Sequence, residues 1–260
     1  MSQPIRYFFF VTLFLLLLLG CKKDDSQDVV TDPTAENKKA LGTSAEDILS
    51  DDLYNSLTIE FIFTPSSKPT EESINAFRNF LNARVKKPGG IFFIETSISN
   101  QAGAPFTLDE IKDFEEEFRT QYTEGNEIAV SIFFANGSSS NDTETSVTLG
   151  TAYRNTSIVV YETTLKNVTN SDPVILPLLE QTVMQHEFGH ILGLVNIQND
   201  DIHNNHEDPS ASKHCIVEEC LMYFEASNFL VSDITRFIGN GSVPQLDPLC
   251  IGDLQAKGGK

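Results

Sequence analysis

Strand-like and helix-like segments alternate through the middle of the chain, and this order restricts the folds that it can adopt. Strands are expected where β-branched and aromatic residues gather, and helices where apolar residues recur every three or four positions. The expected segments are strand 57–63, helix 70–86, strand 91–97, helix 107 to about 122, strand 127–135, strands 145–149 and 157–161, and helix 173–194. This order predicts an α/β or α+β domain with a twisted, mostly parallel sheet and flanking helices.

Local signals mark the ends of several helices. Pro88-Gly89-Gly90 stops the first helix, and the capping-box pattern from Thr107 to Glu110 starts the second. In the last helix, Pro177 is the residue at which a break is expected.

This last helix carries two histidines four residues apart, with a glutamate directly after the first. Positions i and i+4 share one helix face, so His186 and His190 are expected to point at one metal ion. Glu187 lies one step round the helix, where its carboxylate can reach a metal-bound water. All 5 histidines fall between residues 186 and 214, which favours a zinc site over a structural helix that carries two histidines by chance.

A catalytic zinc ion takes three protein ligands and keeps one position open, so the third ligand must come from later in the chain. Gly193 can adopt the left-handed conformation that ends the helix and turns the chain back under the metal.

Residues 186–193 read His-Glu-x-x-His-x-x-Gly and resemble the metzincin metallopeptidases. In that family the third ligand follows the glycine by three residues, which gives Asn196 here, and an amide is a poor zinc ligand. Residues 214–222 read His-Cys-x4-Cys-x-Met and resemble the archaemetzincins, whose third histidine opens this arrangement. The resemblance implies a metzincin-like fold with a loop inserted after Gly193, and it makes His214 the third ligand.

Some assignments at this site stay open. His206 is the alternative third ligand, because it belongs to a polar cluster with Glu207 and Asp208 in the inserted loop. The resemblance also implies that Met222 lies beneath the metal in a Met-turn, and the alternative for Met222 is ordinary core packing.

The cysteines raise a second question of metal binding. Archaemetzincins hold a structural zinc with the Cys-x4-Cys pair and a later Cys-x-x-Cys, and the corresponding residues here are Cys215, Cys220, Cys250 and Asp253. A Cys3Asp zinc site is one interpretation, since three cysteines cannot all pair with one another. The other is one disulfide with one free thiol, which an oxidising compartment favours. The resemblance implies a small C-terminal subdomain around these residues.

The amino-terminal residues resemble the signal of a bacterial lipoprotein. Residues 7–19 are almost entirely apolar but too few to span a bilayer comfortably, and Leu18-Leu19-Gly20-Cys21 resembles a lipobox. The resemblance implies a signal peptide at 1–20, a lipid on Cys21 and an outer-membrane location, with Asp24-Asp25 favouring the cell surface. A lone hydrophobic anchor is the alternative. We expect a flexible polar tether at 21–44 and one folded domain at 45–260.

The chain is strongly acidic, with a formal net charge of -19 at pH 7. Such a charge repels nucleic acid and anionic lipid headgroups, so we expect no nucleic-acid partner. We expect a monomer.

Together these features predict a zinc-dependent endopeptidase in which Glu187 is the general base. We expect its peptide or protein substrate to extend an edge strand, for which 147–153 is the candidate. One alternative is a non-catalytic surface lipoprotein that keeps a structural zinc and binds a peptide, a glycan or a protein. Another is a zinc hydrolase with a non-peptide substrate. Glu187 argues against the first alternative, because a structural site needs four protein ligands and no general base.

Overall fold

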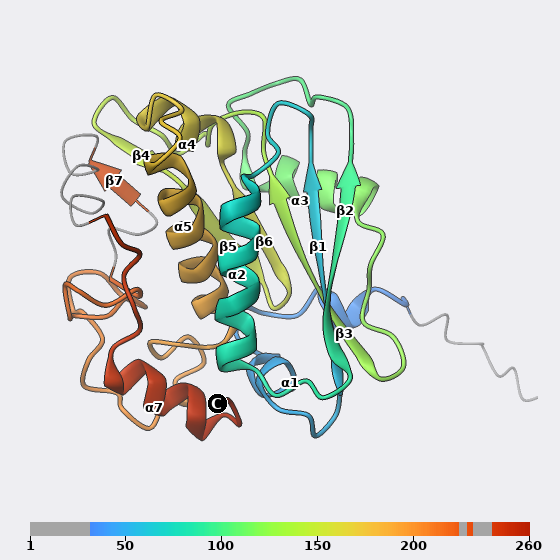
Figure 1. Cartoon of the computed structure of the whole chain (residues 1–260), viewed down its shortest axis with the longest axis vertical. Helices are drawn as coiled ribbons and strands as arrows, with labels where there is room; N and C mark the ends of the chain where they lie inside the picture. Colours follow the sequence, from blue (N-terminus) through green and yellow to red (C-terminus); the bar gives the residue numbers. More distant parts are fainter. Residues whose placement is uncertain (1–31, 224–227, 231–240) are drawn as a thin grey trace, which may run out of the picture. The chain divides into compact units, whose positions relative to one another are not determined.

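A five-stranded sheet in the order β2-β1-β3-β6-β5 forms the centre of the protein (Figure 1). The structure is a computed structural model and describes residues 32–223, 228–230 and 241–260. β1, β2, β3 and β6 run parallel to one another, which confirms the predicted α/β class. The strands of this sheet are β1 (Ser56–Phe63), β2 (Gly90–Ser97), β3 (Glu127–Phe134), β5 (Gly150–Arg154) and β6 (Ser157–Val160).

The sheet ends in an antiparallel edge strand. β5 pairs antiparallel with β6, and its regular register is interrupted between Ala152 and Arg154. β4 (Ser146–Thr148) lies outside this sheet and pairs antiparallel with β7 (Asn228–Leu230). The sequence predicted one strand at 145–149. The chain instead forms two strands that flank Leu149, and the second makes a hairpin with β6.

Helices cover both faces of the sheet (Figure 1). Alternate residues of a strand point to opposite faces, and the two apolar clusters follow this rule. Phe61 of β1 belongs to the larger cluster, with Phe77 of α2 and Val183 of α5, whereas Ile62 joins the smaller cluster with Ile111 of α3. The helices are α1 (Ala45–Leu49), α2 (Glu71–Arg84), α3 (Leu108–Phe118), α4 (Glu162–Val168), α5 (Ile175–Ile191) and α7 (Pro248–Ala256), with a short 3-10 turn at Ala35–Asn37.

The predicted helix boundaries are partly confirmed. The capping box of α3 is present, because Thr107 Oγ1 accepts from Glu110 N–H and the Glu110 carboxylate accepts from Thr107 N–H. α3 ends at Phe118, earlier than predicted, because Arg119 leaves the helix with extended backbone. α5 is unbroken at Pro177, which occupies the first turn, where the backbone N–H has no partner within the helix.

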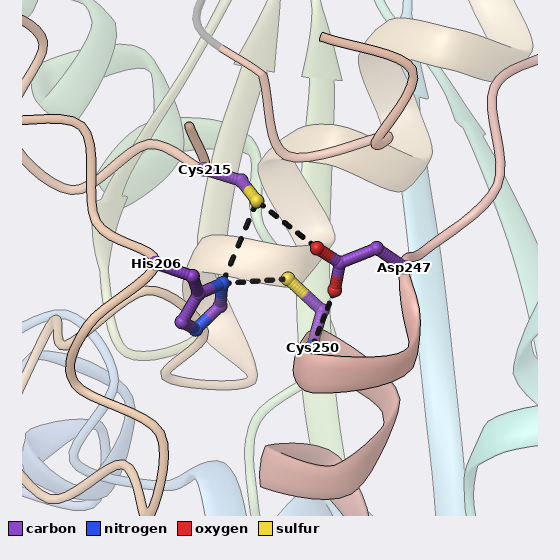
Figure 2. Close-up of side chains that lie close together, drawn as sticks. All are labelled: His206, Cys215, Asp247 and Cys250. Atoms are coloured by element: carbon purple, nitrogen blue, oxygen red, sulfur yellow. Dashed lines mark hydrogen bonds between the residues drawn. The ribbon is translucent and has the colours of Figure 1, made fainter. Parts of the chain in front are cut away.

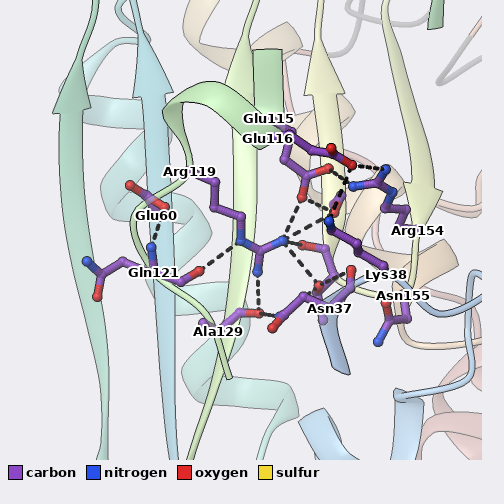
Figure 3. A network of polar contacts seen from close by, with 12 residues as sticks. Asn37, Lys38, Glu60, Glu115, Glu116, Arg119, Gln121, Ala129, Arg154 and Asn155 are labelled. Atoms are coloured by element: carbon purple, nitrogen blue, oxygen red, sulfur yellow. Dashed lines mark hydrogen bonds and ion pairs between the residues drawn. The ribbon is translucent and has the colours of Figure 1, made fainter. Parts of the chain in front are cut away.

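Arg119 is the centre of a buried polar network beneath the sheet (Figure 3). Its guanidinium lies 2.7 Å from Glu115 Oε1 and donates to the carbonyl oxygen of Ala129 at 2.9 Å. The other Glu115 oxygen pairs with Arg154 at 3.0 Å. Because Arg154 is the last residue of β5, this network fastens one end of the edge strand to α3.

The folded part of the chain begins before the predicted boundary at residue 45. Asn37 is fully buried, and its Nδ2 donates to Ala129 O at 2.9 Å and to Thr156 Oγ1 at 3.0 Å. Residues 33–260 accordingly form one compact unit, so the tether does not extend to residue 44. The expected signal peptide and Cys21 lie outside the described residues. Within the described ranges, no helix has the length and apolar character that crossing a bilayer requires.

Candidate metal centre

His186, His190 and His214 lie together at the end of α5, although 24 residues separate the second from the third in the sequence. The Nε2 atoms of His186 and His190 are 3.1 Å apart, and all three residues offer a ring nitrogen within 4.8 Å of the others. Two nitrogens bound to one tetrahedral zinc at about 2.0–2.1 Å would be roughly 3.3–3.4 Å apart. The predicted convergence of the three imidazoles is therefore present. His206, the alternative third ligand, lies instead among the cysteines.

Hydrogen bonds orient two of these rings for metal binding. His186 Nδ1 lies 2.7 Å from the carbonyl oxygen of Leu221, and His214 Nδ1 lies 3.0 Å from that of Ser212. A carbonyl only accepts, so each Nδ1 carries the proton and each Nε2 keeps its lone pair for a metal. For His190, Nδ1 is buried and has no hydrogen-bond partner among the described residues.

Burial keeps the three imidazoles neutral. It lowers the pKa of His186 to about 3, helped by the neighbouring His214, and it lowers the pKa of His190 well below its usual value. Burial also lowers the pKa of His214. Neutral imidazoles are the form that binds zinc, so the site needs no proton release from these residues near neutral pH.

Glu187 lies between this group and the edge strand. Its Oε2 accepts a hydrogen bond from Ala152 N–H at 2.8 Å, while its Oε1 is buried and lacks a partner among the described residues. Burial raises the pKa of Glu187 to about 8, although the Ala152 N–H opposes the shift. A cation held by the histidines would lower this pKa again, because its positive charge favours the carboxylate.

Met222 packs beneath the histidines. A Cβ atom added to Gly189, inside the histidine motif, would lie 2.3 Å from Met222 Sδ. Only a glycine lets the thioether approach the helix this closely. The loop that carries Met222 closes on itself, since Cys215 N–H donates to Met222 O at 2.8 Å. This bond brings His214 and Met222 to the same side of α5.

Gly193 ends α5 as the sequence predicted. It is left-handed, with a φ of 72°, and the backbone bonds Leu194 N–H to Gly189 O and Gly193 N–H to His190 O form a Schellman motif. Asn196 does not approach the histidines as a ligand. Its backbone N–H donates to Asp201 at 2.7 Å and its carbonyl accepts from Lys213, so it organises the segment 195–213, hereafter the 195–213 loop.

A cleft of about 390 Å³ opens beside these side chains. β5, the metal centre and the 195–213 loop all contribute to its walls, through Thr151, Ala152, Glu187, His190, Ile197 and His214. Ala152 N–H points away from β6 toward Glu187, so this side of β5 faces the cleft. An extended chain in the cleft would therefore lie along the strand edge and pass the three histidines.

Cys215, Cys220 and Cys250 form a second cluster, and each is a free thiol. Figure 2 shows Cys215 and Cys250 of this cluster with His206 and Asp247. Cys220 Sγ lies 3.7 Å from Cys250 Sγ, and His206 Nδ1 lies 3.5 Å from Cys215 Sγ. Hydrogen bonding from Cys215 and Cys250 lowers the pKa of Cys220 to about 3. Asp253, expected as the fourth member, instead lies behind His206 and accepts at 3.0 Å from its Nε2.

Comparison with known proteins finds similarity at the level of the fold. No family model matches the chain, and no curated protein sequence matches it. Among solved structures, the crystal structure of archaemetzincin from Methanopyrus kandleri is similar, with a TM-score of 0.50 and 14% sequence identity. The match covers 78% of this chain and 96% of that chain. This chain has an archaemetzincin-like fold. At this identity the similarity concerns the fold alone.

One residue of the site was not found from the sequence, and His206 was named there but assigned to the other histidines. Ala152 contributes through its backbone N–H, which no side-chain pattern reveals. The place of His206 depends on how the 195–213 loop folds, and the only available signal was the gathering of histidines near the cysteines.

Proposed function

We propose that this protein is a zinc-dependent peptidase whose zinc is held by His186, His190 and His214. One observation carries the proposal. The three neutral imidazoles converge on one point, and a buried glutamate beside them is bonded to the backbone of a sheet edge. Three nitrogen ligands suit zinc and leave a fourth position open, which is the pattern of a catalytic site rather than a structural one.

A zinc ion supplies Lewis-acid activation of a water molecule and of the scissile carbonyl. Glu187 accepts the proton of that water and later donates it to the leaving amine. The Ala152 N–H holds Oε2 in place, so the free Oε1 is the atom that exchanges the proton. Met222 and the Leu221 carbonyl fix α5 and His186 from below.

The substrate is an extended peptide that pairs with β5. The backbone groups of β5 that face away from β6 border the cleft, and main-chain bonds at such an edge recognise a peptide without regard to its side chains. The predicted range 147–153 thus narrows to the first residues of β5. Ile197 and Lys213, which line the opposite wall, are the side chains placed to select among peptides.

The test compares residues 33–260 with their Glu187→Gln variant. Glutamine keeps an acceptor for the Ala152 N–H but cannot take the proton, so zinc content should be unchanged and peptide hydrolysis should fall by about 10²–10⁴-fold. Glu180→Gln is the matched control, since Glu180 is a buried glutamate on the same helix but outside the cleft. This control should keep both zinc and hydrolysis.

Two results would contradict the proposal. Zinc content that is unaffected by His214→Ala would show that the three histidines are not one site. Bound zinc without hydrolysis above the Glu187→Gln level, across a mixture of unrelated peptides, would favour the non-catalytic binding protein instead.

We also propose that the mature protein begins at Cys21 and is anchored by lipid to the bacterial outer membrane. The proposal rests on the sequence Leu18-Leu19-Gly20-Cys21. Mass spectrometry of the amino-terminal peptide from the expressed full chain tests it. An unmodified Cys21 would overturn it.

A further inference from the structure

The 195–213 loop sends one buried histidine into the cysteine cluster. His206 is 2% exposed, and its Nδ1 lies 3.5 Å from Cys215 Sγ and 3.9 Å from Cys250 Sγ (Figure 2). Cys220 Sγ is 3.7 Å from Cys250 Sγ. His206, Cys215 and Cys220 belong to one stretch of the chain and Cys250 to α7, and all four residues are buried.

These distances match those of a four-ligand metal site. Zinc–sulfur bonds of about 2.3 Å in a tetrahedron place two sulfurs roughly 3.8 Å apart. A nitrogen at about 2.0–2.1 Å lies roughly 3.6 Å from each sulfur. Three measured separations, His206 to Cys215, His206 to Cys250 and Cys220 to Cys250, agree with these values, whereas a disulfide would need sulfurs about 2.05 Å apart.

Asp247 also offers a carboxylate oxygen within 4.8 Å of the ligand atoms of His206, Cys215 and Cys250. Its Oδ1 caps α7 by accepting from Cys250 N–H at 2.7 Å, and its Oδ2 lies 3.3 Å from Cys215 Sγ. Cys220 Sγ is surrounded differently, because the N–H groups of Met222 and Asp247 both donate to it at 3.4 Å. Donors directed at a sulfur favour the thiolate that binds a metal, so Cys220 is the better ligand.

Asp253 occupies the position of an orienting carboxylate. Its Oδ2 lies 3.0 Å from His206 Nε2, and its Oδ1 accepts from His203 N–H at 2.9 Å. A carboxylate on the far nitrogen fixes the tautomer that leaves Nδ1 free for a metal. The nearby Asp201 is not available as a ligand, because it pairs with Lys257.

We propose that His206 is the fourth ligand of a second metal site, with Cys215, Cys220 and Cys250, and that this site holds the 195–213 loop in place. Asp253 is a positioning residue in this arrangement, and not the fourth ligand. Zinc is the expected ion, since three thiolates and one imidazole form a closed structural site for it.

The second site has a consequence for the cleft. Ile197 and Lys213 stand on the cleft wall near the two ends of the loop, and His214 directly precedes the ligand Cys215. A metal that holds His206 and Cys215 therefore limits the movement of this wall and of His214. This last step rests on the proposed function, whereas the metal site itself does not.

The experiment counts metals in residues 33–260 carrying Glu187→Gln, which prevents self-cleavage. We expect two zinc ions per chain, and one in His206→Ala. In the cobalt-substituted protein, His206→Ala should weaken the sulfur-to-cobalt absorption and expose the cysteines to a thiol reagent. His206→Cys supplies another zinc ligand and should restore the second zinc. Asn205→Ala, at an exposed position of the same loop, is the control and should keep both ions.

Asp253→Asn tests the positioning role. It should weaken zinc binding at the second site by about 10–100-fold, while the cobalt spectrum of the saturated protein keeps its thiolate band. Limited proteolysis of the 195–213 loop should be faster in His206→Ala than in Asn205→Ala.

Two zinc ions in His206→Ala, with all three cysteines still protected, would overturn the proposal. A Cys220–Cys250 disulfide with no second zinc in protein purified without reductant would also overturn it. A protein that binds both zinc ions and hydrolyses no peptide would contradict the proposed function but support this site.

Discussion

At Gly150 the backbone of β5 comes so close to α5 that no side chain fits between them. A Cβ atom there would lie 2.7 Å from Val183 Cγ1 and 2.9 Å from Glu187 Cγ. Gly150→Ala should therefore displace Glu187 and lower kcat/KM by about 100-fold, because small misplacements of a catalytic group are costly. Zinc content should be unchanged.

The control for this prediction is Gly125→Asn. Gly125 is left-handed, with nothing within 4 Å of an added Cβ, and asparagine tolerates that conformation. Full activity in Gly150→Ala would show that the spacing between β5 and Glu187 is not needed.

Lys87 is a buried cation that binds the stretch of chain at the end of α1 and directly after it. Its ammonium donates to the carbonyl oxygens of Asp47, Ser50 and Tyr54, and burial lowers its pKa to about 8. It is therefore still mainly charged at pH 7. Lys87→Met leaves these carbonyls without the donor and should lower the free energy of unfolding by about 2 kcal/mol, as measured by urea denaturation. The exposed neighbour Lys86 supplies the comparison, since Lys86→Met should change the free energy of unfolding little.

Single residues of the metal centre were predictable to different degrees. Helix geometry alone places His186 and His190 on one face, so their spacing was sufficient. His214 could be assigned only through the resemblance of residues 214–222 to archaemetzincins, because no short-range sequence pattern connects His214 to α5. Asp253 was misplaced as a direct member of the cysteine cluster, since the sequence cannot show that His206 folds in between.

Between α4 and α5, two buried glutamates face each other. Burial and the neighbouring Glu180 raise the pKa of Glu162 well above its usual value, against the opposing charge of Lys166. Glu180 in turn accepts from the Thr70 N–H at 2.9 Å. A carboxyl whose pKa is raised by folding stabilises the protein at acidic pH, and this contribution is lost as the pH rises through the folded-state pKa.

Glu162→Gln should therefore reduce the loss of stability between pH 5 and pH 8. At pH 8 we expect a melting temperature roughly 2–4 °C higher than in the unmodified protein, equivalent to about 1 kcal/mol. Thermal unfolding followed by circular dichroism measures it, with the exposed Glu72→Gln as the comparison. The same pH dependence in both variants would mean that Glu162 does not titrate as described.

Helices and strands whose apolar residues recur at regular spacing were predictable from the sequence, and short elements were not. β1, α2, β2, α3 and β3 appear in the predicted order, because each repeats apolar residues at the spacing of its own structure. α4 has only seven residues and was missed, although it supplies one side of the acidic pair. α7 was missed too, but Asp247-Pro248 is a recognisable helix start with a capping residue and proline at the first turn.

For the whole molecule, the clearest difference between the prediction and the structure is the residue at which the folded domain begins. Composition suggested a tether to residue 44, because polar residues dominate that stretch. The structure uses one of them as a core residue, since Asn37 bonds to Thr123, Ala129 and Thr156. Polarity alone cannot separate a solvated residue from one whose hydrogen bonds are made inside the protein.

A chain that starts at Ala45 should be less stable than one that starts at Pro33. Removing Asn37 leaves partners in the sheet without their bonds, and the expected loss is about 3 kcal/mol in the free energy of unfolding. Urea denaturation of the two chains measures the difference. Equal midpoints would mean that residues 33–44 contribute nothing to stability.

The interrupted pairing of β5 has a consequence for solubility. An open sheet edge can capture the edge of another molecule, and natural proteins prevent this with short strands, bulges and charged residues. β5 has all three features, since it spans only Gly150–Arg154, loses its register after Ala152 and ends in the ion-paired Arg154. The peptide substrate proposed above needs only the first residues of β5, whereas a second folded sheet cannot extend along the strand. The short edge is therefore compatible with that proposal and resists edge-to-edge aggregation.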